Sequence, residues 1–264
     1  MNKIILLILL IGGILFFSLY YEKKQLQIYF LDVGQGDAIL IRSPQGQNIL
    51  IDGGPDNQLL SSLGQVLPWW ERQIDYVIVS HYHDDHFTGL IELLNKYKIK
   101  NVLVTAHQPD DFLYQVWTGK LLAKNIKPTV VKAGDSFVAS DGLSWQVILA
   151  DSEHEDYNEN SLVIKLSYKD NDFLLMGDLG IEGEERILAS GLDINTDYLK
   201  VGHHGSKYSS SAEFLKAVSP EVCIIQSGKD NKFGHPHLET LERLESVGCQ
   251  IINTQDLGTI SFNF

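Results

Sequence analysis

The sequence predicts an α/β fold in which two mixed β-sheets lie face to face and helices cover both outer faces. Short apolar stretches of strand length alternate with helical periodicity from residue 25 onward. Turns such as Pro44-Gln-Gly46 between early strands favour hairpins, and therefore sheets that are not wholly parallel. A weak internal similarity relates Ile49-Leu-Ile-Asp52-Gly to Leu174-Leu-Met-Gly-Asp178, because each ends an apolar strand in Asp and Gly. Two such halves, each a sheet covered by helices, give a four-layer αββα sandwich.

The elements follow in order from the pattern of apolar and polar residues. Early strands are expected at 27–31, 38–42, 48–51, 76–80 and 101–104, with helices beginning near Thr88 and spanning 112–125. Further strands are expected at 130, 145–149, 162–168 and 173–176. The C-terminal part alternates helices at 182–190, 212–217 and 237–246 with strands at 198–201, 222–226, 250–253 and 259–263. No linker interrupts residues 25–264, which we treat as one domain.

The first 24 residues form a separate segment. Residues 4–21 carry no charged side chain and stand between Lys3 and Glu22-Lys-Lys24. This length just spans a bilayer and exceeds the apolar core of an ordinary signal peptide. Because small residues that would mark a cleavage point are missing, we favour a membrane anchor over residues 1–24, with a cleaved signal segment as the alternative. Its N-terminal position favours placement of the domain that follows it outside the cytoplasm, either anchored to the membrane or secreted.

Composition limits the partners of the domain. Of the 264 residues, 44% are hydrophobic, which is enough for one large domain with a substantial core. The formal net charge is −13, from 34 acidic and 21 basic residues, so the chain as a whole has no electrostatic attraction for nucleic acid. Cys223 and Cys249 lie in apolar strand-like stretches, which favours buried free thiols over a disulfide.

Several metal-binding side chains are concentrated in the run His81-Tyr-His83-Asp-Asp85-His86, directly after an apolar strand. Imidazole nitrogens and carboxylate oxygens suit Zn, Mn or Fe, and an α/β sheet usually places its active site at the carboxyl ends of its strands. In a loop, His81 and His83 can turn towards one ion. Asp85 and His86 can then reach a second ion. The alternative is a polar surface loop, and the density of ionisable residues argues against it.

The order of motifs resembles the metallo-β-lactamase fold, in which a run of this kind after one strand is joined by Met176-Gly-Asp178 after another. Four more motifs narrow the resemblance to the hydrolase domain at the C-terminus of ComEC-type DNA-uptake proteins and its free-standing relatives; they are Phe30-Leu-Asp-Val-Gly-Gln-Gly-Asp37, Asn160-Ser-Leu-Val163, Leu199-Lys-Val-Gly-His-His-Gly-Ser206 and Gly234-His-Pro-His237. The similarity covers about residues 26 to 264. This chain offers one membrane helix at most, so the resemblance alone does not assign DNA uptake.

The resemblance implies a site for two divalent metal ions, Zn or Mn. His81 and His83 would hold the first ion, whereas Asp85 and His86 would hold the second. Asp178 follows a buried strand and would bridge both ions.

The resemblance also assigns roles to the two adjacent histidines and a second role to Asp85. His204 would complete the shell of the second ion and His203 would face the substrate, although adjacent residues point apart and the sequence leaves the reverse assignment open. Asp85 would orient the attacking water or donate a proton, in addition to binding metal. Asp85 and His203 are therefore the expected catalytic residues. Two ions would share a water and lower its pKa to about 7.

One position departs from the wider family. Many members place a third histidine before the bridging aspartate, where this chain has Asn160-Ser161. We expect Asn160 to fill that position, as in the ComEC-like subgroup, and His154 to be a residue of the acidic loop 151–159. An amide is a poorer ligand than imidazole for a borderline metal, so either the first ion is weakly held or the preferred metal is Mn.

Hydroxyl, ammonium and imidazole donors suited to phosphate oxygens follow in the C-terminal part. We expect substrate contacts from these and from the amide above, namely Asn160, Ser206, Lys207, His235 and His237. A phosphodiester, DNA included, is the expected substrate, although the acidity of the chain argues against tight, nonspecific binding to DNA. The alternatives are an amide or lactam hydrolase of the same fold and a noncatalytic subunit of a competence complex.

Overall fold

The computed structural model describes residues 3–22, 25–139 and 141–264. Its N-terminal half supplies six strands of a seven-stranded sheet, and the C-terminal strand β14 supplies the seventh. The strand order is β14-β1-β2-β3-β4-β5-β6. β1 to β3 and β14 pair antiparallel, whereas β3 to β6 are parallel. The strands are β1 (Gln27–Phe30), β2 (Ile39–Arg42), β3 (Asn48–Ile51), β4 (Gln73–Ile78), β5 (Lys98–Val104), β6 (Thr129–Val130) and β14 (Ile260–Asn263).

The C-terminal half builds the second seven-stranded sheet, ordered β13-β12-β11-β10-β9-β8-β7. β7 to β10 are antiparallel, and β10 to β13 are parallel. The strands are β7 (Ser136–Val138), β8 (Ser144–Leu149), β9 (Val163–Tyr168), β10 (Asn171–Leu175), β11 (Tyr198–Lys200), β12 (Val222–Ile225) and β13 (Gln250–Asn253). Both sheets are therefore mixed, as the sequence predicts.

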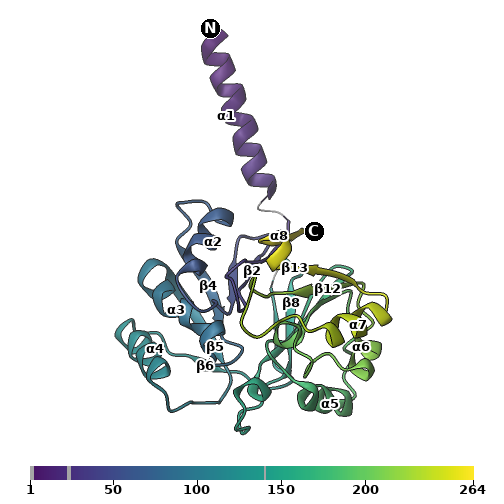
Figure 1. Cartoon of the computed structure of the whole chain (residues 1–264). Coiled ribbons are helices and arrows are strands. Elements are labelled where there is room, and N and C mark those ends of the chain that lie inside the picture. Colours follow the sequence, from purple (N-terminus) through teal and green to yellow (C-terminus); the bar gives the residue numbers. More distant parts are fainter. Residues whose placement is uncertain (1–2, 23–24, 140) are drawn as a thin grey trace.

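Helices cover the outer face of each sheet (Figure 1). The first sheet carries α2 (Gln58–Val66), α3 (Asp84–Lys96) and α4 (Phe112–Ala123). The second carries α5 (Ile181–Ser190), α6 (Ala212–Val218) and α7 (Leu238–Ser246). Shorter turns of helix are η1 (Tyr157–Asn160), η2 (Gly202–Gly205) and α8 (Thr254–Leu257).

Three hydrophobic cores separate the four layers and confirm the αββα sandwich. Alternate residues of one strand point to opposite faces of a sheet, so Leu40 packs under the helices of the first sheet while Ile39 and Ile41 pack between the sheets. Trp145 and Phe173 meet them from the second sheet. A third core lies between the second sheet and α5 to α7.

Local departures from the predicted elements are small. The helix expected from Thr88 begins at Asp84, because the acidic residues Asp84 and Asp85 occupy its first turn, where they interact favourably with the helix dipole. The sequence does not predict α2, which is only nine residues long and is held by burial of Leu59 and Leu63 against the core of the first sheet.

The prediction of free thiols is wrong, because Cys223 and Cys249 form a disulfide. Both cysteines are buried, as expected. β12 and β13 are parallel neighbours, and Cys249 directly precedes β13. This places the two Cα atoms 6.0 Å apart, within the span of a disulfide. The pairing depends on strand order, which cysteine spacing alone does not reveal.

The N-terminal helix α1 (Lys3–Glu22) projects away from the two sheets (Figure 1). Among the described residues, no helix combines the length and the apolar character needed to cross a membrane. This differs from the anchor that the sequence predicts over residues 1–24. Residues 1–2 and 23–24 of that segment lie outside the described part of the chain, so the division at residue 24 stays a prediction.

Candidate metal centre

The candidate ligands converge where strands of both sheets end. His81 follows β4 by two residues, and His83 is the residue that caps the N-terminus of α3. The start of this helix turns the chain, so that Asp85 and His86 leave its first turn towards the second sheet. There Asp178 follows β10, and His204 lies in η2 after β11. The four segments thus bring ligands from both halves of the chain to one place.

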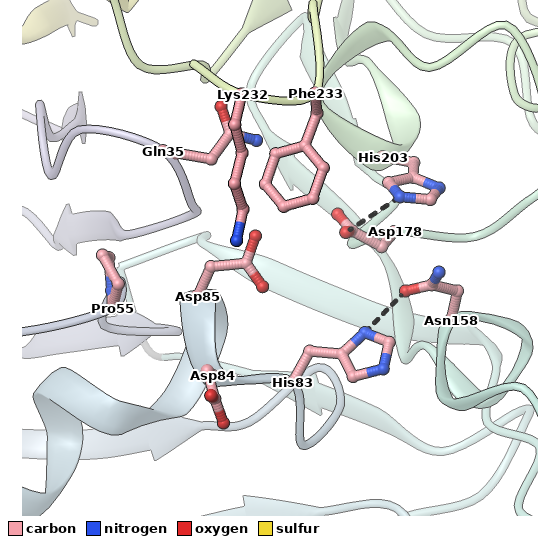
Figure 2. A pocket seen from close by; sticks show the side chains of 10 residues that line it. All are labelled: Gln35, Pro55, His83, Asp84, Asp85, Asn158, Asp178, His203, Lys232 and Phe233. Carbon is pink, nitrogen blue, oxygen red and sulfur yellow. Dashed lines mark hydrogen bonds and ion pairs between the residues drawn. The ribbon is translucent and has the colours of Figure 1, made fainter.

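The first pair of ligands is oriented by hydrogen bonds at close range. His81 Nε2 lies 3.2 Å from His83 Nδ1, so the two ring nitrogens face one position. His83 Nδ1 also lies 2.9 Å from the amide oxygen of Asn158 (Figure 2). On the other side of its ring, His81 Nδ1 lies 3.0 Å from the Ser80 hydroxyl. This cluster therefore offers two imidazole nitrogens and one amide oxygen.

The second group consists of Asp85, His86, Asp178 and His204, whose ligand atoms all lie within 4.8 Å of one another. His86 Nε2 is 3.2 Å from Asp178 Oδ1. His204 Nε2 is 3.2 Å from Asp178 Oδ2 and 3.3 Å from Asp85 Oδ2. Asp178 thus lies between the two histidines, as a bridging or shared carboxylate requires.

The chemistry of these atoms fits a divalent metal ion. His86 Nε2, His204 Nε2 and Asp178 Oδ1 are buried and have no hydrogen-bond partner among the described residues. Buried polar atoms are rarely left without a partner. Two imidazole nitrogens and two carboxylates are also a ligand set that zinc and manganese accept. A cation bound between them would satisfy these atoms.

Neighbouring side chains determine which ring nitrogens face the centre. Asp52, at the end of β3, accepts a hydrogen bond of 2.9 Å from His86 Nδ1 and is itself held by Ser80. His204 Nδ1 donates to the backbone oxygen of Gln226 at 2.8 Å. These bonds leave Nε2 of each histidine free for a metal, which is how supporting residues fix metal-binding imidazoles.

A buried ion pair supports the same region from behind. Asp37 Oδ1 lies 3.3 Å from His204 Nδ1, and the other carboxylate oxygen of Asp37 pairs with Lys200. The Lys200 ammonium also donates to the Gly177 carbonyl oxygen at 3.2 Å. Asp37 and Lys200 are both almost fully buried, so each needs the other for its charge to be tolerated.

Electrostatics keep the ligand carboxylates ionised. Burial alone would favour a neutral Asp178, but His204 and His86 outweigh burial and hold the pKa of Asp178 well below its usual value. Burial likewise opposes ionisation of Asp85, and its contacts with His204 and His86 nevertheless lower its pKa. Burial, reinforced by the charge of His86, lowers the pKa of His81 and favours its neutral, metal-binding form.

Backbone geometry brings the loops close enough for these contacts. Gly36 has a φ of +137°, and a Cβ atom there would lie 2.2 Å from the Asp85 carbonyl oxygen. Only glycine therefore lets the loop before Asp37 touch the start of α3. His203 and His204 both adopt left-handed conformations, with φ of 47° and 54°. Such strain in consecutive non-glycine residues is typical of functional sites.

A cavity of about 660 Å³ opens in front of the centre (Figure 2). Its lining combines ligands with residues of surrounding loops, namely Gln35, Pro55, His83, Asp84, Asp85, Asn158, Asp178, His203, Lys232 and Phe233. His203 lies in this lining with 26% of its side chain exposed, and its Nε2 is 3.9 Å from Asp178 Oδ2. The geometry thus favours His204 as the ligand and His203 as the residue that faces substrate.

The expected substrate-binding residues are placed differently. The Asn160 amide is held within its own loop, where it donates to the His154 carbonyl oxygen at 2.8 Å and accepts from the His154 backbone N–H at 3.1 Å. Asn158 instead faces His83. Asn160 is therefore not at the expected position beside the first ion, because η1 turns its side chain into the loop that contains His154.

The other four expected contacts also lie outside the cavity lining. Ser206 is buried, and the exposed side chain of Lys207 lies over the ring of Tyr208. The ring centroid of His235 is 5.5 Å from that of His203. His237 Nδ1 accepts a hydrogen bond from the Lys207 backbone. The role of these four residues as substrate contacts therefore stays a prediction.

Some residues of the site are not singled out by the sequence. Asp52 could have been found, because its strand-end position matches that of Asp178. Asn158 and Lys200 give no such signal, because their roles depend on how η1 folds and on which strands are neighbours. Phe233 lies in a loop whose direction the sequence does not define, whereas Lys232 in the same loop is a donor that suits phosphate oxygens on sequence grounds.

Comparison with known proteins agrees with this geometry. The metallo-β-lactamase superfamily model matches residues 31–228. The ComE operon protein 3 of Bacillus subtilis is 30% identical over 260 residues, which cover 90% of this chain and 33% of the relative. Recombination protein 2 of Haemophilus influenzae is 33% identical over 267 residues, covering 98% of this chain and 31% of the relative. The chain thus spans about a third of the length of these relatives.

The solved structures show the same fold. The metallo-β-lactamase fold protein YhfI of Bacillus subtilis superposes with a TM-score of 0.62 and 13% identity, over 90% of this chain and 100% of that protein. At this identity the likeness shows the fold alone. The family match, the αββα layers and the His and Asp groups at their junction together show that the chain belongs to the metallo-β-lactamase superfamily and resembles the ComEC-type branch within it.

Proposed function

We propose that this chain is a binuclear metal-dependent phosphodiesterase that cleaves nucleic-acid esters. The observation that carries the proposal is the position of Asp178, between His86 and His204 and at the floor of a cavity that also exposes His83. His81 and His83 would hold one ion, and Asp85, His86 and His204 the other, with Asp178 shared between them. When bound, two such ions activate water and polarise the ester under attack.

The remaining residues of the cavity suit a phosphate ester. His203 can hydrogen-bond a phosphoryl oxygen above Asp178, and Lys232 supplies an ammonium group at the rim. Asp85 is partly exposed at the cavity, with 26% of its side chain accessible, so it can orient a nucleophile as well as bind metal. Donors placed where charge develops in a transition state are worth more than donors in water.

The net charge of the chain and the names of its relatives narrow the expected class of substrate. A net charge of −13 disfavours tight, nonspecific binding to DNA, so we expect brief contacts with a short stretch of substrate. The relative named for recombination, together with the resemblance to the ComEC-type branch, favours a nucleic-acid ester over a lactam.

The disulfide supports the expected compartment. Disulfides persist in oxidising compartments and are rare in the cytosol. The bond between Cys223 and Cys249 therefore favours a catalytic domain outside the cytoplasm. The compartment is tested by cell fractionation, and N-terminal sequencing of the mature protein tests whether α1 is retained.

A turnover screen tests the activity. The full chain is reconstituted with Mn or Zn and assayed on bis-p-nitrophenyl phosphate and single-stranded DNA, and in parallel on a chromogenic cephalosporin. We expect turnover of the phosphodiesters and none of the cephalosporin. Asp178→Asn should abolish turnover, whereas Asp256→Asn, at an exposed position in α8, should not. Turnover of the cephalosporin alone would replace the proposal with the lactamase alternative, and no turnover of any substrate would favour a noncatalytic subunit.

His203→Gln separates binding of metal from binding of substrate. If His203 faces the substrate, this variant should retain bound metal and lose turnover by about 10²–10³-fold, the usual cost of a lost donor at such a site. Loss of one equivalent of metal in the variant would instead make His203 a ligand.

A further inference from the structure

The loop between β12 and α7 places an aromatic ring and a positive charge side by side over the cavity. Phe233 and Lys232 both line the cavity, and Figure 2 shows them extending from the loop towards Asp85 and Asp178. The Phe233 side chain is 50% exposed. The ring therefore presents apolar surface to the cavity, where a ligand can cover it.

The loop holds this ring in a fixed position. Asn231 accepts hydrogen bonds from the backbone N–H groups of Phe233 and His235 at 3.2 and 3.0 Å, and its amide donates to the Gly228 carbonyl oxygen at 2.9 Å. The ring of Phe233 stacks on that of His235, with 5.7 Å between centroids and 19° between planes. The ring is therefore a preorganised surface, which lowers the entropic cost of binding a ligand.

The charge beside the ring is available to a ligand. The Lys232 ammonium lies 4.9 Å from the centre of the Phe233 ring, and no carboxylate of the described residues lies within ion-pair distance of it. A lysine has a long, flexible side chain. The Lys232 ammonium can therefore move away from the Phe233 ring when a planar ligand group stacks there, and it can then contact an adjacent anion.

We infer that Phe233 and Lys232 form a nucleotide subsite, in which an unpaired nucleobase stacks on Phe233 while the neighbouring phosphate contacts Lys232. The inference rests on the proposed phosphodiesterase function and names its substrate class as single-stranded nucleic acid. A base inside a duplex has no free face for the ring, whereas stacking on an aromatic side chain is the common way in which single strands are held.

The test compares two single strands of equal length, one with bases and one made only of abasic nucleotides. kcat/KM is measured for the full chain reconstituted with Mn, and the readout is the ratio between the strands. We expect a preference of roughly 5- to 150-fold for the strand with bases, the range that one stacked base provides. Phe233→Ala should remove this preference and Phe233→Trp should keep it. Phe112→Ala, an exposed phenylalanine of α4 outside the cavity, is the matched control and should keep the wild-type ratio.

Lys232 is tested on both strands, because its partner is the phosphate. Lys232→Gln should lower kcat/KM on the two strands alike, whereas Lys229→Gln, at an exposed position of the same loop, should not. A base preference that is equal in wild type and Phe233→Ala overturns the inference while leaving phosphodiesterase activity intact. If the wild type cleaves neither strand, the proposed function falls and the inference falls with it. Thermal unfolding of each variant shows that it is folded.

Discussion

Replacing Asp52 by Asn should weaken metal binding, although Asp52 is not expected to touch the metal. Its carboxylate accepts hydrogen bonds from the Ser80 backbone N–H at 2.7 Å, from the Ser80 hydroxyl at 2.6 Å and from His86 Nδ1 at 2.9 Å. An amide offers one acceptor oxygen in place of two. If that oxygen keeps its hydrogen bond from the Ser80 backbone N–H, the NH₂ group faces His86 Nδ1.

The size of the effect follows from the histidine tautomer. A donor facing Nδ1 favours the imidazole with its proton on Nε2, the atom that lies 3.2 Å from Asp178. The second group then loses one of its four metal-binding atoms in the favoured tautomer. Changes to such supporting residues typically cost 10–100-fold in metal affinity, or about 1.4–2.7 kcal/mol.

The assay is a competition titration of the metal-free chain against a fluorescent chelator. Asp75→Asn is the matched control, because Asp75 is also a buried aspartate that accepts three hydrogen bonds, from the Asn48 backbone, Lys100 and Gln73. Asp75 lies near the start of β4, at the end of the strand remote from His81. The control should lower stability without lowering metal affinity. Equal affinities of Asp52→Asn and wild type, or an equal loss in both variants, would refute the reasoning.

Three further outcomes follow from the structure. Gly36→Ala should displace Asp85, whose carbonyl oxygen would lie 2.2 Å from the new Cβ, and should reduce both turnover and bound metal at least tenfold, measured beside a thermal melt. Reducing the bond between Cys223 and Cys249, separated by 26 residues, should lower the free energy of unfolding by about 3–4 kcal/mol; unchanged urea unfolding under reductant would contradict this. Burial raises the pKa of Glu184 from 4.5 to about 7, so the folded chain binds more protons than the unfolded chain between these values, and stability present at low pH is lost as the pH rises towards 7. Between pH 5 and pH 8 the free energy of unfolding, measured with urea, should fall by about 2 kcal/mol more in wild type than in Glu184→Gln. Parallel pH profiles of the two proteins would contradict this prediction.

Much of the fold could be predicted because its signals are local. Strand and helix periodicity depends on neighbouring residues, and strands buried on both faces contain consecutive apolar residues, as Tyr76-Val-Ile78 in β4 and Phe173-Leu-Leu175 in β10 do. The metal-binding run from His81 to His86 is local too, since its spacing alone brings four donors together. Asp178 could be added because it comes shortly after a buried strand, whereas His204 is predicted from the resemblance to the ComEC-type hydrolase domain.

The errors concern features that depend on the arrangement of distant segments. Cys223 and Cys249 meet because β12 lies beside β13, and no property of either cysteine indicates this. Asn158 and Asn160 are two residues apart in one turn of η1, so a small change in the turn decides which amide faces His83. His235 and His237 flank a proline in a loop that contributes Phe233 to the cavity lining, and their own role as substrate contacts stays a prediction.

The balance of charge gives a reason, independent of the family, to expect bound cations. The centre contains four aspartates, Asp37, Asp52, Asp85 and Asp178, and one lysine, Lys200, whose charge is used by Asp37. Carboxylates held together out of water repel one another, and divalent ions between them would remove that cost.

Removal of metal should therefore destabilise the fold. A ligand present at 100 times its Kd stabilises the folded state by about 2.7 kcal/mol, which for a chain of this size raises Tm by about 5–10 °C. A chelator should lower the Tm of wild type by this amount, and added Mn or Zn should restore it. Asp178→Asn, which has lost the shared carboxylate, should melt at the same temperature with and without chelator. If the chelator left the Tm of wild type unchanged, the negative charge of these aspartates would be balanced by protons on His86 and His204 rather than by metal.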